Sequence, residues 1–157
     1  MKGNIFYRCE ECGNLVAQMK SCEGTLTCCG QDMKKLKVNS TDALKEKHVP
    51  VAEAVDEKLI VTVGSAAHPM TPEHYIEWIA LVSDDKTAIA YLKPGMEPKA
   101  EFPYSQEEPG MPFTGENDEV IVNCEGQICN FVFGDVTAKE VSVYTFCNIH
   151  GLWKLEV

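Results

Sequence analysis

The chain has 157 residues, of which 45% are hydrophobic, and a formal net charge of -10 at pH 7. The hydrophobic fraction is sufficient for a folded core and excludes a disordered chain. The acidic charge argues against nucleic-acid binding, because phosphates require a basic surface. No apolar run approaches the ~18 residues that span a bilayer, and the N-terminus has no apolar stretch of signal-peptide length. We therefore expect a soluble cytoplasmic protein with no membrane partner.

The cysteines and histidines divide the chain into two parts. Five of the eight cysteines lie in the first 30 residues, none lies between Cys29 and Cys124, and all four histidines follow residue 47. This distribution predicts two domains, residues 1–37 and 38–157. A domain of fewer than ~40 residues usually needs a metal, disulfides or a partner chain to fold.

Four N-terminal cysteines have a spacing that is typical of one metal site: Cys9, Cys12, Cys28 and Cys29. A glycine follows each pair, where a tight turn can aim backbone N–H groups at sulfur. Four thiolates select zinc or iron. Because Cys28 and Cys29 are adjacent, we expect a widened angle at the metal, unlike that of a zinc ribbon. A purely structural zinc site stays an alternative, and a thioredoxin-like CxxC is disfavoured because no βαβ pattern surrounds it.

The strand patterns predict a mainly β protein. In the first domain, residues 4–9 and 25–29 are expected to form a metal-stabilised hairpin. In the second domain, seven strands are predicted, over residues 58–64, 74–83, 86–92, 119–124, 129–134, 139–147 and 152–157. They favour an immunoglobulin-like antiparallel β-sandwich. Thr71 and Pro72 leave a helical turn over residues 71–78 as an alternative, and a proline-rich loop is expected between Leu92 and Glu119.

The second domain carries a second candidate metal site. Its potential ligands are His48, His68, His74, Cys147 and His150. Zinc prefers four ligands, so five ligands over-supply it. Iron accepts four imidazoles and a thiolate as a square pyramid, which leaves a sixth position open. A blue-copper site would use two histidines, a cysteine and a methionine, and no methionine follows His150.

The motifs resemble known families in chain order. A desulforedoxin-like domain is indicated by YRCEECGNLV and CCGQDM, and a superoxide reductase domain by EKHVPV, AHPMTPEHYIEW, LKPG and CNIHGLWK. Together they resemble desulfoferrodoxin, the two-iron superoxide reductase, over most of the chain. The apparent departure is an insertion at about residues 103–131, which leaves the ligand positions intact.

The resemblance implies two non-haem iron ions per chain. The four N-terminal cysteines would hold a rubredoxin-like iron, and the four histidines would form the equatorial plane of a catalytic iron with Cys147 axial. The implied reaction is one-electron reduction of superoxide to hydrogen peroxide, with electrons from an external donor such as rubredoxin. The resemblance also implies a homodimer. Lys47, beside a ligand, would attract superoxide, and Glu46 would close the sixth position in the ferric state.

The sequence alone also allows other functions. The chain could be an electron-transfer or metal-binding module with copper in its second site, or an interaction protein stabilised by zinc. Cys22 is expected to be a spare thiol. Cys124 and Cys129 bracket a four-residue turn, so a disulfide is an alternative there, although free thiols are favoured in a reducing compartment.

Overall fold

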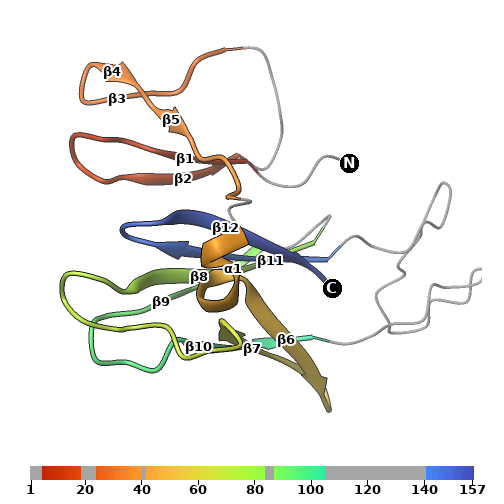
Figure 1. Cartoon of the computed structure of the whole chain (residues 1–157). Helices are drawn as coiled ribbons and strands as arrows, with labels where there is room; N and C mark the ends of the chain where they lie inside the picture. Colours follow the sequence, from red (N-terminus) through yellow and green to blue (C-terminus); the bar gives the residue numbers. More distant parts are fainter. Residues whose placement is uncertain (1–4, 19–23, 40–41, 84–86, 105–140) are drawn as a thin grey trace, which may run out of the picture.

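The structure, a computed structural model, describes residues 5–18, 24–39, 42–83, 87–104 and 141–157. Within these residues the chain is almost entirely β, with antiparallel strands and one short helix (Figure 1). A small N-terminal β unit precedes a two-sheet sandwich. The predicted fold class is therefore confirmed.

The N-terminal unit contains five short strands: β1 (Ile5–Arg8), β2 (Leu15–Gln18), β3 (Thr27–Cys28), β4 (Gln31–Asp32) and β5 (Lys34–Lys35). β1 lies between β2 and β5, whereas β3 pairs with β4 and with no other strand in the part of the unit that the structure describes. The predicted hairpin between residues 4–9 and 25–29 is therefore wrong. The chain reverses at once after the first cysteine pair, because the N–H of Gly13 donates to the carbonyl oxygen of Cys9 at 3.0 Å. β2 consequently becomes the neighbour of β1.

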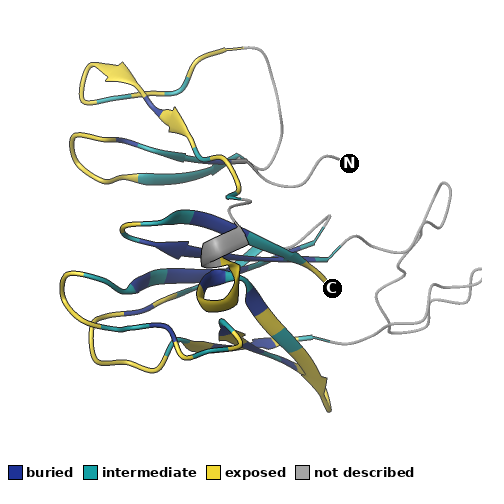
Figure 2. Cartoon of the chain, in the orientation of Figure 1, coloured by how far each residue is buried: buried dark blue, intermediate teal, exposed yellow. Residues whose placement is uncertain are grey.

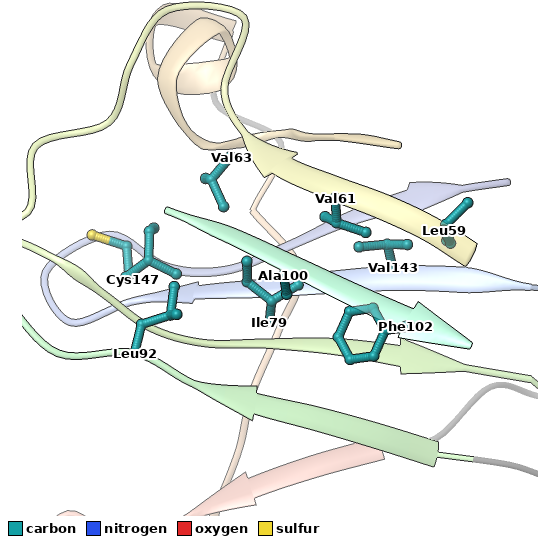
Figure 3. Packing of buried hydrophobic residues seen from close by; sticks show 10 residues of the cluster. Leu59, Val61, Val63, Ile79, Leu92, Ala100, Phe102, Val143 and Cys147 are labelled. Carbon is teal, nitrogen blue, oxygen red and sulfur yellow. The ribbon is translucent and has the colours of Figure 1, made fainter. Parts of the chain in front are cut away.

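The sandwich contains one helix and seven strands among the described residues: α1 (Asp42–His48), β6 (Pro50–Val55), β7 (Lys58–Val63), β8 (Ile76–Val82), β9 (Thr87–Tyr91), β10 (Lys99–Pro103), β11 (Ser142–Cys147) and β12 (Gly151–Glu156). One sheet has the order β10-β7-β6 and the other β12-β11-β8-β9. Apolar side chains from both sheets, such as Val61 and Ile79, form the core between them (Figure 3). Cys147 belongs to the same cluster, so this ligand is anchored in the core.

Strand β11 is buried along its whole length (Figure 2). Val143 faces the core between the sheets. Tyr144 and Phe146 face the other way and pack with Trp78 and with Phe6 of β1. The ring centroids of Phe6 and Trp78 are 5.0 Å apart. The N-terminal unit therefore covers the outer face of the larger sheet, which removes apolar surface from water on both sides of β11.

Five of the seven predicted sandwich strands are confirmed, namely those at β7, β8, β9, β11 and β12. The predicted strands at residues 119–124 and 129–134 lie outside the described residues, as do Cys22, Cys124 and Cys129. The proline-rich segment contains β10, whose residues alternate between exposed and buried positions. Residues 71–78 do not form a helix, because β8 begins at Ile76. No helix among the described residues is long and apolar enough to cross a membrane.

Candidate metal centres

Four imidazole rings lie at the corners of a square. The ring centroids of neighbouring corners are 4.6 Å apart for His48 and His68, 4.7 Å for His68 and His74, 4.8 Å for His74 and His150, and 4.5 Å for His150 and His48. The rings of His48 and His74, on a diagonal, are 6.0 Å apart and nearly parallel. Four imidazoles in this order surround a common centre, as the equatorial ligands of one ion would.

Cys147 completes the group. Its thiol is buried, and its Sγ lies 3.5 Å from Nδ1 of His150. Two ligand atoms at right angles on one ion would be separated by about 3 Å, from typical metal–nitrogen and metal–sulfur distances of about 2.1 and 2.3 Å. Burial raises the pKa of the Cys147 thiol, while the backbone N–H groups of Ile149 and His150 lower it by hydrogen-bonding to sulfur. A bound cation would favour the thiolate further.

The donor atoms fit a metal ion in two ways. One ligand atom from each of the five residues lies within 4.8 Å of every other. In addition, Nε2 of His68 and Nε2 of His74 are buried without a hydrogen-bond partner among the described residues. Nδ1 of His68 lies 2.6 Å from the carbonyl oxygen of Pro69, so as a donor there it leaves Nε2 with a free lone pair. Buried polar atoms are rarely left unpaired, and a metal would satisfy them.

The five residues come from separate loops and strand ends. His48 ends α1, His68 and His74 lie between β7 and β8, and Cys147 and His150 flank the turn between β11 and β12. Trp153 of β12 stacks on His48 with ring centroids 5.1 Å apart. This arrangement places the ligands at one end of the sandwich, where loops meet the ends of rigid strands.

Gly64 allows the α1 loop to approach the loop after β7. It has a φ of 80°, and a Cβ at this position would lie 2.7 Å from the carbonyl oxygen of Lys47. The carbonyl oxygen of Glu46 accepts hydrogen bonds from the N–H of Ser65 at 2.9 Å and of Ala66 at 3.3 Å. The backbone next to His48 is thus fixed by the segment that leads to His68.

Asn148 joins the His74 loop to the end of β11. Its side-chain oxygen accepts a hydrogen bond from the N–H of Tyr75 at 2.9 Å, and its side-chain nitrogen donates to the carbonyl oxygen of Glu73 at 2.9 Å. Its own backbone N–H donates to the carbonyl oxygen of Tyr75 at 3.1 Å. One amide therefore holds both neighbours of His74 beside Cys147.

The backbones of His48 and His150 are also held by side chains that do not belong to the ligand set. The hydroxyl of Thr145 donates to the carbonyl oxygen of His48 at 3.0 Å. The side-chain amide of Asn39 donates to the carbonyl oxygen of His150. Partners of this kind orient the ligands before any ion binds.

Glu46 and Lys47 are exposed beside this group. The pKa of His74 is lowered by burial, by His150 and by the positive charge of Lys47. The carboxylate of Glu46 is not among the five ligands, and no sixth His, Cys or acidic residue joins them in the described part of the chain.

The four N-terminal cysteines also meet. Sγ of Cys28 lies 3.6 Å from Sγ of Cys12 and 3.9 Å from Sγ of Cys29. The edge of a tetrahedron of thiolates would measure about 3.8 Å for metal–sulfur bonds of about 2.3 Å, so the expected widening between the adjacent cysteines is small. Cys29 adopts a left-handed φ of 51°, which allows the adjacent side chains of Cys28 and Cys29 to reach one ion.

Backbone N–H groups support the thiolate form at this site. Hydrogen bonds from the N–H groups of Cys12 and Glu11 lower the pKa of Cys9 to about 7, although burial opposes them. Neighbouring thiols raise the pKa of Cys29 to about 12. Thiols this close cannot all ionise unless a cation compensates their charge, which is the condition that a metal ion would meet.

Two family models match the chain in consecutive segments. The desulfoferrodoxin model matches residues 40–156, and the model of the desulfoferrodoxin N-terminal domain matches residues 2–36. The chain belongs to the desulfoferrodoxin family. Family membership explains why two metal-ligand sets occur in this order.

Individual relatives agree with this assignment. A desulfoferrodoxin of Desulfarculus baarsii is 40% identical over 150 residues, which cover 96% of this chain and 94% of that protein. A superoxide reductase of Pyrococcus horikoshii is 36% identical over 132 residues, or 80% of this chain and 97% of that protein. The solved superoxide reductase of Treponema pallidum superposes with a TM-score of 0.66 at 25% identity and covers 99% of both chains.

Both groups of ligands that the structure brings together were predicted from the sequence. The residues that position them were not, above all Asn39, Thr145 and Asn148. Asn148 stands between two expected ligands in the CNIH motif, and this placement was the available indication of a role. For Asn39 and Thr145 the sequence contains no comparable indication, because each reaches a ligand about 100 residues away.

Proposed function

We propose that this chain is a superoxide reductase, which reduces superoxide by one electron to hydrogen peroxide. The observation that carries the proposal is the square of four imidazoles with a buried thiol beside it. The balanced reaction takes one electron and two protons per superoxide and releases no dioxygen. His48, His68, His74, His150 and Cys147 would hold the catalytic iron, which supplies the electron when it is ferrous.

The donor set explains the choice of iron. Five ligands exceed the four that zinc prefers. A blue-copper site would need two histidines, whereas four imidazoles converge here. An iron bound in this way would keep one coordination position for a small anion, since no sixth protein ligand joins the set among the described residues.

Lys47 and Glu46 are the residues that we assign to the open position. The Lys47 ammonium gives an acidic protein a local positive charge that attracts superoxide. Lys47 directly precedes His48, one of the candidate ligands, and its side chain is exposed, which supports this role. Glu46 would close the sixth position in the ferric state, which requires its exposed side chain to rotate towards the metal while its backbone stays fixed.

The four cysteines would hold a second, non-catalytic iron that passes electrons. The units that carry the two irons would correspond to residues 1–37 and 38–157, in keeping with the change of ligand chemistry between them. An external donor such as rubredoxin would return the catalytic iron to the ferrous state. We further propose a cytoplasmic homodimer that protects the cell from oxidative stress, in keeping with the acidic surface and the thiol-rich composition.

Metal analysis combined with product analysis tests the proposal. The purified protein should contain two irons per chain, and its ferrous form should yield one hydrogen peroxide per superoxide without dioxygen. Release of dioxygen at half the rate of superoxide loss would identify a dismutase instead. Copper or zinc in the histidine site of active protein would also overturn the assignment.

A further inference from the structure

Strand β8 contains a bulge directly opposite Cys147. In the pairing of β8 with β11, Trp78 lies opposite Phe146, but Cys147 lies opposite Ile76, so Glu77 has no partner of its own. Strict alternation from Ile79, which faces the core, would turn Glu77 into the core as well. The bulge instead places Ile76 in the core and releases Glu77 from it. Bulges next to functional sites commonly redirect a side chain in this way.

The redirected carboxylate meets the N-terminal unit. Arg8 of β1 donates two hydrogen bonds to Glu77, at 3.1 and 3.2 Å, and forms a bidentate ion pair with it. The side chains of Arg8 and Glu77 are 30% and 24% exposed. The Arg8 guanidinium also lies 4.9 Å from the ring centroid of Phe146. A bidentate arginine pair has a fixed geometry, which a loose surface pair lacks.

This ion pair connects the two metal sites along the chain. Arg8 directly precedes Cys9, a ligand of the four-cysteine site, and Phe146 directly precedes Cys147. The Arg8 side chain contacts both Glu77, at the bulge, and Phe146, the residue before the Cys147 thiol. The rings of Phe6 and Trp78 pack beside this ion pair. Apolar packing is non-directional, whereas the bidentate ion pair fixes the orientation of β1 relative to β8.

We propose that Arg8 and Glu77 are positioning residues through which the N-terminal unit holds the β8 bulge, fixes Cys147 and balances the charge near the catalytic iron. This inference rests on the proposed function for the identity of that iron. The Glu77 carboxylate alone would stabilise the ferric state, and Arg8 neutralises it. Neither residue touches the metal.

The test measures the reduction potential of the iron in the histidine site of the full-length holoprotein by spectroelectrochemistry. Arg8→Gln should lower the potential, because an uncompensated carboxylate favours the more positive ferric state. Glu77→Gln should raise it, because Arg8 is then uncompensated. The double variant should return close to the wild-type value. Arg8→Lys keeps the charge but loses the bidentate geometry, so its potential should lie between those of Arg8→Gln and the wild type.

Lys34→Gln is the matched control. Lys34 forms an exposed ion pair with Glu10 at 2.8 Å within the N-terminal unit, so its removal changes the net charge equally without touching β8. Its potential should equal that of the wild type. Amide hydrogen exchange on the same holoproteins should be several-fold faster at Phe146–Asn148 in the Arg8→Gln, Glu77→Gln and double variants, and unchanged in Lys34→Gln.

Two results would overturn the inference: a wild-type potential in Arg8→Gln, or unchanged exchange at Phe146–Asn148 in both single variants. The proposed function fails separately, if wild-type protein does not convert superoxide to hydrogen peroxide. The potentials and exchange rates are measured without superoxide, so the two failures are distinguishable.

Discussion

The side-chain oxygen of Asn148 accepts a hydrogen bond from the backbone N–H of Tyr75 at 2.9 Å, across 73 residues of sequence. With the second bond from Asn148 to the carbonyl oxygen of Glu73, it fixes the loop of His74 relative to Cys147. The distance between these two ligands therefore depends on a residue that binds no metal.

Asn148→Ala removes both hydrogen bonds of this amide. We expect the histidine site to lose about 10- to 100-fold in iron affinity, the range found when partners of metal ligands are removed. Competition with a chelator measures the affinity, and the four-cysteine iron should be retained. Glu73→Ala is the control, because it removes an exposed side chain but keeps the carbonyl oxygen. Equal iron loss in the two variants would contradict the role of Asn148.

Gly64→Ala should destabilise the protein because it combines two costs. A left-handed φ costs an alanine about 1 kcal/mol, and the Cβ would lie 2.5 Å from the carbonyl oxygen of Ala66, for which crowding adds about 1–3 kcal/mol. Gly95→Ala has a similar φ of 83° but no atom within 4 Å of the Cβ. Denaturant unfolding should show a clearly larger loss for Gly64→Ala, and equal losses would refute the close approach.

Lys47→Ala should slow superoxide capture by up to about tenfold and flatten its dependence on ionic strength, because local charge raises the association rate of an anion. Iron content should not change, since Lys47 is not a ligand. Pulse radiolysis measures the second-order rate. Lys35→Ala, which removes the same charge from the N-terminal unit, should leave the rate unaltered. An unaltered rate in Lys47→Ala would exclude it from the mechanism.

The stability of the metal-free protein should depend on pH through His68. Burial, together with the other imidazoles, lowers the pKa of His68 from 6.5 to about 4. The unfolded chain therefore binds this proton first, and the free energy of unfolding should fall as the pH decreases from 6.5 to about 4. Unfolding curves over this range measure the slope, which should be smaller in His68→Gln. A slope unchanged by that substitution would contradict the assignment.

The closely spaced ligands could be predicted from short motifs whose spacing reflects the geometry of a metal ion: Cys9 precedes Cys12 by three residues, as Cys147 precedes His150. His48, His68 and His74 are more widely spaced, and their assignment to one iron also depended on the resemblance to desulfoferrodoxin. The hairpin partner of β1 was predicted wrongly because strand pairing depends on where the chain reverses. The chain already reverses at Gly13, but CEECG was interpreted as a metal-binding motif alone and not also as a hairpin turn.

β10 and the bulge at Glu77 show a different limit. The alternating exposure of β10 was present in the sequence, but the surrounding prolines favoured a loop. The bulge is created by the pairing of β8 with β11, and the N-terminal unit on the far face of the sheet occupies the space into which Glu77 turns. The bulge depends on contacts between segments about 70 residues apart, so it cannot be predicted from the local sequence of β8.

The segment that follows the four-cysteine unit, at Val38 and Asn39, also supports the backbone of the histidine site. Val38 pairs with Leu152 in a parallel bridge, and Asn39 binds the backbone of His150. A shortened version that starts after Asn39 would therefore lose a support of an imidazole as well as a domain, so anyone who engineers a single-iron form should cut the chain ahead of Val38.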